Sequence, residues 1–184
     1  MNHLGTQILE TERLILRPLQ VHDAQSMFDH WASDPEVAQY VTWEAHTSLD
    51  TVTEHLSHRE EAYRESLDFY DWGMVLKDSG TLIGTITFVG TSDRDQVAEL
   101  GYCMGKKWWS QGLMTEAGRA VLDFGLNQVG FHRIYACHDI RNPASGKVLK
   151  KLGMTYEGTS REARVVKGER VTLAFYSILK SEQQ

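Results

Sequence analysis

The chain has 184 residues, of which 41% are hydrophobic and 24% charged, and its formal net charge is −6 at pH 7. This length suits one domain, which we expect to span residues 1–184 with its core at about 9–179. The acidic balance argues against nucleic acid as a partner, and the lack of a long apolar run or signal-peptide pattern argues against a membrane and favours a cytoplasmic location.

The first part of the chain reads as a strand followed by helices. Residues 13–19 alternate in a run of β-forming residues, which predicts a strand, and residues 21–32 look helical. The sequence Asp34-Pro35-Glu36 marks a break. Ser48 is a candidate N-cap for a long polar helix that ends at about Ser66.

A β meander is expected next. Residues 72–76 and 81–89 are rich in β-forming residues, and the turn signal at 77–80 between them predicts an antiparallel hairpin. A third run at 97–104 follows the polar loop 91–96 and extends the meander.

The second half predicts alternating helices and strands. Small and apolar residues recur at helical spacing over 115–128, and a short strand-like run follows at 133–137. A helix is expected over 143–152, ended by Gly153, and two strands close the chain at 155–161 and 171–179. The class is therefore α+β, with a mixed and mostly antiparallel central sheet of about seven strands flanked by about four helices.

The segment from Trp108 to Ala117 joins a predicted strand to a predicted helix and contains Gly112. Such a turn lets backbone N–H groups converge on an anion at the positive end of the helix dipole, so a pyrophosphate would fit there. The glycine patterns of nucleotide-triphosphate loops and dinucleotide folds are absent. The alternative is that Gly112 only turns the chain and that Thr115 caps the helix.

Four segments occur in an order that is typical of one family: Thr11–Pro18, Ala98–Tyr102, Gln111–Ala117 and Asn142–Met154. Together they resemble the GNAT superfamily of N-acetyltransferases, in particular the branch of the ribosomal-protein N-terminal acetyltransferases. The resemblance extends from about Leu9 to Leu179.

The resemblance implies acetyl-CoA as co-substrate. No metal is expected, because the His and Cys residues lack the spacing of a zinc site. In that family the strand before the loop binds the pantetheine arm through its backbone, the loop amides hold the pyrophosphate, and an asparagine contacts the cofactor arm. The matching residues here are Tyr102, Cys103, Met104, Gln111, Gly112, Leu113, Met114, Thr115 and Asn142. The family pattern Q/R-x-x-G-x-G/A aligns with Trp109 to Met114, and only Gly112 matches it strictly.

Two catalytic residues are expected. Glu99, in the strand beside the thioester, is the candidate general base, although it could also be a carboxylate that faces solvent. Asn142 reads as the N-cap of the second helix and places Ser145 on its inner face. The resemblance implies that Ser145 or a nearby tyrosine protonates the leaving thiolate, whereas the physical alternative is a simple first-turn hydroxyl.

Further candidates for proton transfer are His132, His138 and three tyrosines that could instead be core or rim aromatics, namely Tyr102, Tyr135 and Tyr176. Direct attack on the thioester needs no enzyme nucleophile, and the two cysteines, Cys103 and Cys137, are expected to be buried reduced thiols.

The acceptor is expected to be a primary amine, and a protein N-terminal α-amine is favoured; the resemblance points to that of a ribosomal protein. A small amine such as a polyamine, amino acid or antibiotic is the alternative, and a non-catalytic acyl-CoA-binding module is another. The resemblance implies an acceptor pocket at about 32–70 and 162–170, where Trp31, Trp43, Tyr63 and Trp72 either line it or fill the core. A monomer and a homodimer are both open.

Overall fold

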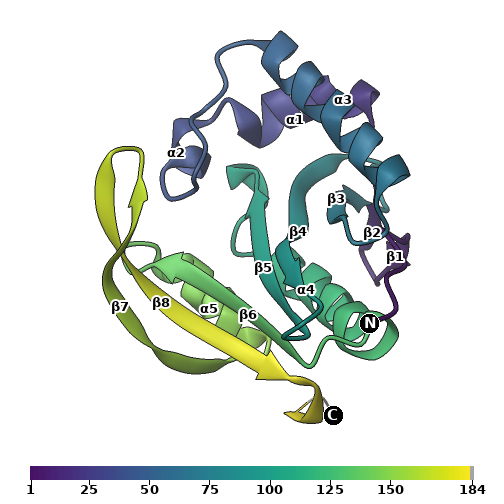
Figure 1. Ribbon diagram of the computed structural model, residues 1–184. Helices are drawn as coiled ribbons and strands as arrows, with labels where there is room; N and C mark the ends of the chain where they lie inside the picture. Colours follow the sequence, from purple (N-terminus) through teal and green to yellow (C-terminus); the bar gives the residue numbers. More distant parts are fainter. Residues whose placement is uncertain (183–184) are drawn as a thin grey trace.

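The computed structural model describes residues 1–182, in which eight strands form one sheet. The strands are β1 (Leu9–Glu10), β2 (Leu14–Arg17), β3 (Tyr70–Leu76), β4 (Leu82–Ser92), β5 (Val97–Met104), β6 (Arg133–Asp139), β7 (Thr155–Val166) and β8 (Glu169–Leu179). Their spatial order is β1-β2-β3-β4-β5-β6-β8-β7, and every neighbouring pair is antiparallel except β5 and β6, which are parallel (Figure 1).

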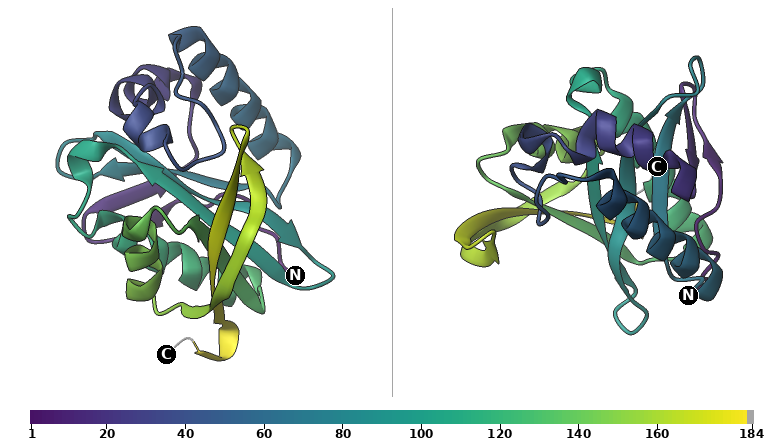
Figure 2. Two further views of the ribbon diagram at one scale, coloured as in Figure 1. Left: turned by 90° about the vertical axis from the view of Figure 1, so that its left-hand side faces the viewer. Right: turned by 90° about the horizontal axis from the view of Figure 1, so that it is seen from above.

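Helices cover both faces of the sheet. They are α1 (Ala24–Met27), α2 (Pro35–Ala38), α3 (Leu49–Glu65), α4 (Leu113–Asp123) and α5 (Pro143–Lys151), and wider helical turns continue α1 and α4 over Phe28–Ala32 and Phe124–Val129. Figure 2 shows α1 and α3 on one side of the sheet and α4 and α5 on the other. No helix within residues 1–182 is both long enough and apolar enough to span a bilayer.

Each face of the sheet has its own apolar cluster. The cluster under α4 and α5 includes Trp72, Phe88 and Phe124, and that under α1 and α3 includes Leu19, Trp31 and Leu56. Along β5 the side chains alternate between them, since Leu100 and Met104 belong to the first cluster while Cys103 packs against the second. Glu99 lies four residues before Cys103, and because side chains alternate along a strand, it points to the same α3 face.

The expected class is confirmed, and the differences lie in short elements and in β7, which continues to Val166 instead of ending at about 161 as the sequence predicts. The meander pairs as predicted, and β5 covers the predicted residues 97–104. The extra strand, β1, has only two residues, too few to give a pattern. The break predicted at Asp34-Pro35-Glu36 is the start of α2, because Asp34 caps it by accepting from the Glu36 amide at 2.8 Å and proline tolerates the first helical position.

The sheet opens between β5 and β6. The two strands pair only from Val97 with Arg133 to Glu99 with Tyr135, after which each continues with its other neighbour. A β-bulge in β4 lies opposite this point, where the register with β5 shifts between Phe88 and Gly90. Because a bulge bends and twists its strand pair, it accounts for the divergence of β5 from β6 in Figure 1.

Candidate active site

The gap beyond Glu99 presents an unpaired strand edge. Within residues 1–182, no strand pairs with the β6-facing edge of β5 after Glu99, so its backbone groups need another partner. The predicted pantetheine-binding residues Tyr102, Cys103 and Met104 lie on this stretch. The side chain of Cys103 contacts the Thr85 hydroxyl at 3.3 Å, away from this edge, so that the edge itself presents backbone groups.

The turn before α4 is tightly folded. Ser110 and Gly112 have φ values of 61° and 79°, both in the left-handed region. Gly112 is the N-cap of α4, no side chain caps this terminus within the described chain, and Gln111 is exposed. The alternative in which Thr115 caps the helix is wrong, since Thr115 lies inside the first turn with 8% exposure.

The first turn of α4 buries its side chains. Leu113, Met114 and Thr115 all point into the core, which leaves their backbone N–H groups at the helix terminus. The bulk of Met114, which departs from the family pattern, is therefore accommodated away from the turn. Free amides at a positive helix end are the donor set that a pyrophosphate requires.

Tyr102 and Ser145 meet on the α5 side of the gap. Asn142 caps α5 by accepting from the Ser145 amide at 3.3 Å, as predicted. The Tyr102 hydroxyl lies 2.9 Å from Ser145 Oγ and donates to the Ser145 carbonyl at 3.1 Å. Burial raises the pKa of Tyr102 far above its ordinary value, so this hydroxyl keeps its proton.

Glu99 lies at the vertex of the gap and contacts β6 and β7. Tyr135 donates to its carboxylate at 3.2 Å, the Cys137 thiol lies 3.6 Å away, and the guanidinium of Arg164 lies at 3.9 Å. The Glu99 side chain is 19% exposed, so the alternative of a carboxylate that simply faces solvent does not describe it. The pKa of Cys137 is raised to about 11, mainly by burial and secondly by the negative charge of Glu99.

Glu99 and Ser145 are therefore separated by the sheet. The carboxylate lies on the α3 face, and the two hydroxyls lie on the α5 face. Tyr135 joins Glu99 instead of Ser145, Tyr176 is buried in β8, and His138 stacks on Tyr176. His132 is exposed beside the closed end of the gap.

A contact between segments far apart in the chain, here called the tether, closes the α3 face: it joins Lys167 to Ala38 and Glu44. Lys167, between β7 and β8, donates to the Ala38 carbonyl at 2.5 Å and lies 3.6 Å from the Glu44 carboxylate. Arg141 stacks over Tyr40 at 6.0 Å. Residues 32–70 and 162–170, predicted to surround the acceptor, thus meet here. The sequence had no signal for Arg164 or Lys167.

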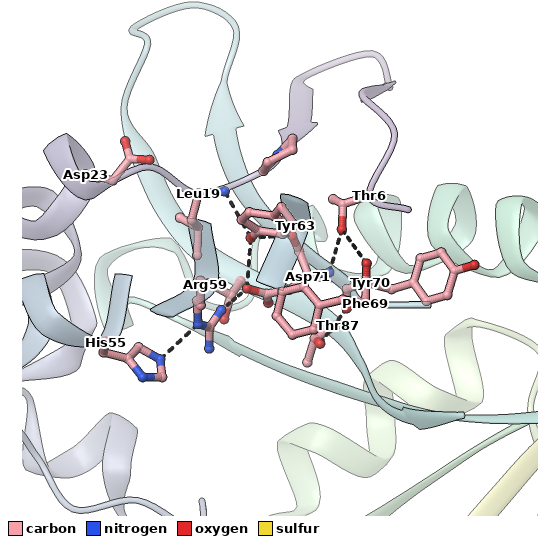
Figure 3. A network of polar contacts seen from close by, with 12 residues as sticks. Thr6, Leu19, Asp23, His55, Arg59, Tyr63, Phe69, Tyr70, Asp71 and Thr87 are labelled. Carbon is pink, nitrogen blue, oxygen red and sulfur yellow. Dashed lines mark hydrogen bonds and ion pairs between the residues drawn. The ribbon is translucent and has the colours of Figure 1, made fainter. Parts of the chain in front are cut away.

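A buried ion pair anchors α3 to β3 on the same face (Figure 3). Arg59 pairs with Asp71, and Tyr63 donates to the Asp71 carbonyl at 2.8 Å. Arg59 also donates to His55 at 2.9 Å, and burial together with the charge of Arg59 lowers the pKa of His55 to about 4. Tyr63 is therefore held by a structural hydrogen bond. Removing either Arg59 or Asp71 from a buried ion pair of this kind costs about 3–5 kcal/mol of stability.

The remaining aromatic candidates divide between core and rim. Trp31 and Trp72 are fully buried, whereas Trp43 is half-buried and stacks on His46. Among the described residues, no group of three or more His, Cys, Asp or Glu side chains is arranged to hold a metal ion.

Comparison with known proteins assigns a family to this arrangement. A family model described as an acetyltransferase (GNAT) domain matches residues 13–155. The chain is 32% identical over 176 residues to the uncharacterized N-acetyltransferase YoaA of Bacillus subtilis, covering 96% of this chain and 98% of the relative. It is 28% identical over 165 residues to the [ribosomal protein uS5]-alanine N-acetyltransferase of Escherichia coli, covering 88% and 84%.

The fold comparison agrees. The crystal structure of an acetyltransferase (GNAT family) from Bacillus anthracis superimposes with a TM-score of 0.85 at 23% identity, covering 96% of this chain and all of that one. The expected resemblance, including that to ribosomal-protein acetyltransferases, is confirmed. Since the family model spans most of its length, the chain belongs to the GNAT family and is an N-acetyltransferase.

Proposed function

We propose that the enzyme transfers the acetyl group of acetyl-CoA to a protein N-terminal α-amine, with the gap between β5 and β6 as the point of transfer. Acetyl-CoA supplies the activated thioester. The Leu113, Met114 and Thr115 amides would hold its pyrophosphate, and the open edge of β5 would hold its pantetheine arm. The fit rests on the uncapped α4 terminus and on the strand edge that lacks a partner among residues 1–182.

The chemistry divides between the two faces. On the α3 face Glu99 accepts the proton that the amine releases as its nitrogen attacks the carbonyl carbon. On the α5 face Ser145, held by Tyr102, donates a hydrogen bond or proton to the sulfur as the C–S bond breaks. A thiolate of ordinary pKa near 8.5 needs only this modest help.

Arg164, beside the proposed base Glu99, influences which acceptor amine the site prefers. The Arg164 guanidinium lies 3.9 Å from Glu99, so an acceptor amine approaches next to a positive charge. This opposes polyamines and protonated lysine side chains more than an α-amine, whose pKa lies about 2.4 units below that of lysine, a roughly 250-fold advantage in the neutral form at pH 7. The uS5-alanine N-acetyltransferase among the relatives points to the same class.

A competition experiment tests the acceptor. Two peptides of one sequence, one with a free N-terminus and an acetylated lysine and the other N-blocked with a free lysine, are mixed with spermidine, and products are read by mass spectrometry. We expect N-terminal acetylation to dominate, and Glu99→Gln to reduce it. Acetylation of lysine or spermidine alone would instead support the small-amine reading, and binding of acetyl-CoA without any product would support a non-catalytic module.

A further inference from the structure

The first turn of α4 contains a carboxylate at the place where the cofactor's phosphates are proposed to bind. Glu116 lies four residues after Gly112, and its backbone N–H bonds to the Gly112 carbonyl at 3.0 Å. Its side chain is 18% exposed. A negative charge here competes with a pyrophosphate for the positive end of the helix dipole.

A distant segment engages this carboxylate. The Thr11 hydroxyl donates to Glu116 Oε1 at 2.5 Å, and the backbone N–H of Arg13 donates to the same oxygen at 2.8 Å. Arg13 Nε donates to Oε2 at 2.7 Å. Burial alone would raise the pKa of Glu116, but these hydrogen bonds outweigh it and lower the pKa, so the carboxylate stays ionised.

The other end of the same guanidinium reaches the turn. Arg13 Nη1 donates to the Gln111 carbonyl at 3.1 Å. Its Nη2 lies 3.6 Å from the position that a Cβ on Gly112 would take. One side chain from the segment between β1 and β2 therefore bridges Glu116 and the turn before α4.

We propose that Arg13, with Thr11, is a positioning residue for the phosphates of acetyl-CoA: it offsets the Glu116 charge and fixes the Gln111–Gly112 turn, so that the amides of Leu113–Thr115 stay available to an anion. This inference rests on the proposed function, because it takes the α4 terminus as the pyrophosphate site. Its new content is that residues outside the loop set the strength of phosphate binding.

A charge-rescue experiment tests it. Acetyl-CoA affinity is measured by calorimetry for Arg13→Ala, Glu116→Gln and the double variant, with Arg119→Ala as a control for loss of an arginine on α4. We expect Arg13→Ala to weaken binding about ten-fold, since an uncompensated charge then faces the phosphates. Adding Glu116→Gln should restore affinity to within about three-fold, and Arg119→Ala should have little effect.

Steady-state kinetics separate positioning from a general structural defect. With acetyl-CoA, Arg13→Ala should raise KM and leave kcat nearly unchanged. With S-acetyl-pantetheine, which has no phosphate, KM should not change. Thr11→Val, which removes one hydrogen bond to Glu116, provides a milder variant with an expected two- to three-fold loss should Arg13→Ala fold poorly.

Three results would overturn the inference: unchanged acetyl-CoA affinity in folded Arg13→Ala, no recovery on adding Glu116→Gln, or an equal rise in KM for S-acetyl-pantetheine. Failure of the proposed function looks different. In that case Gly112→Glu, which puts a charge directly at the turn, would itself leave acetyl-CoA affinity unchanged.

Discussion

The two faces of the gap are built in different ways. On the proposed cofactor face, the donors would be backbone groups of β5 and of the first turn of α4, which lie within one stretch of chain from Val97 to Thr115. On the proposed acceptor face, side chains from β5, β6 and β7 meet around Glu99, and Lys167, after β7, contacts the segment between α2 and α3. A site made of local backbone geometry tolerates varied side chains, whereas a site made of distant side chains is specific to one chain.

The largest expected effect concerns Glu99, the proposed base on the acceptor face. Glu99→Gln should lower kcat/KM about 10²–10³-fold, because a positioned general base contributes this much, and the loss should be greatest at low pH, where the amine is protonated. Glu157→Gln, an exposed carboxylate on β7 that bonds Arg133, is the matched control. A pH profile superimposable on that of the parent enzyme would remove Glu99 from the mechanism.

The thiol beside Glu99 should be inert. The pKa of Cys137 is raised to about 11 from an ordinary 9.0, so the thiolate fraction at pH 8 is about 100-fold smaller. Alkylation by iodoacetamide should therefore be about 100-fold slower in the folded protein than after unfolding, and should accelerate as pH rises. Rapid labelling of Cys137 at pH 7 would contradict this and reopen a covalent route.

The hydroxyl pair on the cofactor face should matter less. Ser145→Ala should lower kcat about ten-fold, or about 1.4 kcal/mol, because the thiolate is already a fair leaving group. Tyr102→Phe should cost less, and the double variant should lose no more than Ser145→Ala alone, since Tyr102 contacts Ser145 and is proposed to act by holding it. Fully additive losses would mean that the two hydroxyls act separately.

The tether should have the smallest effect and should distinguish the faces. Lys167→Ala should change KM for the amine two- to three-fold and leave KM for acetyl-CoA unchanged, with less than about 0.5 kcal/mol lost in unfolding free energy. Lys180→Ala, beyond the end of β8, serves as control. A change in KM for acetyl-CoA alone would contradict the placement of the turn between β7 and β8 on the acceptor face.

What could be predicted from the sequence follows the same division. The β3, β4 and β5 meander, the caps at Ser48 and Asn142 and the turn at Gly112 all rest on local propensities, and the structure has them. The meeting of Glu99 with Arg164 depends on the register of β7, which shifts between Ser160 and Arg164, and no local pattern encodes that shift. The Glu116 to Arg13 contact joins residues 103 positions apart, so the family motifs contained both residues without indicating that they touch.

Calorimetric titration of acetyl-CoA into Gly112→Glu and Gly112→Gln tests the central claim that the turn before α4 binds the pyrophosphate. The φ of 79° strains both substitutions equally, and space is available because a Cβ there would contact only Arg13 Nη2 at 3.6 Å. Only the glutamate adds a negative charge, so we predict binding about ten-fold weaker for Gly112→Glu than for Gly112→Gln. Equal affinity of two folded variants would contradict the placement.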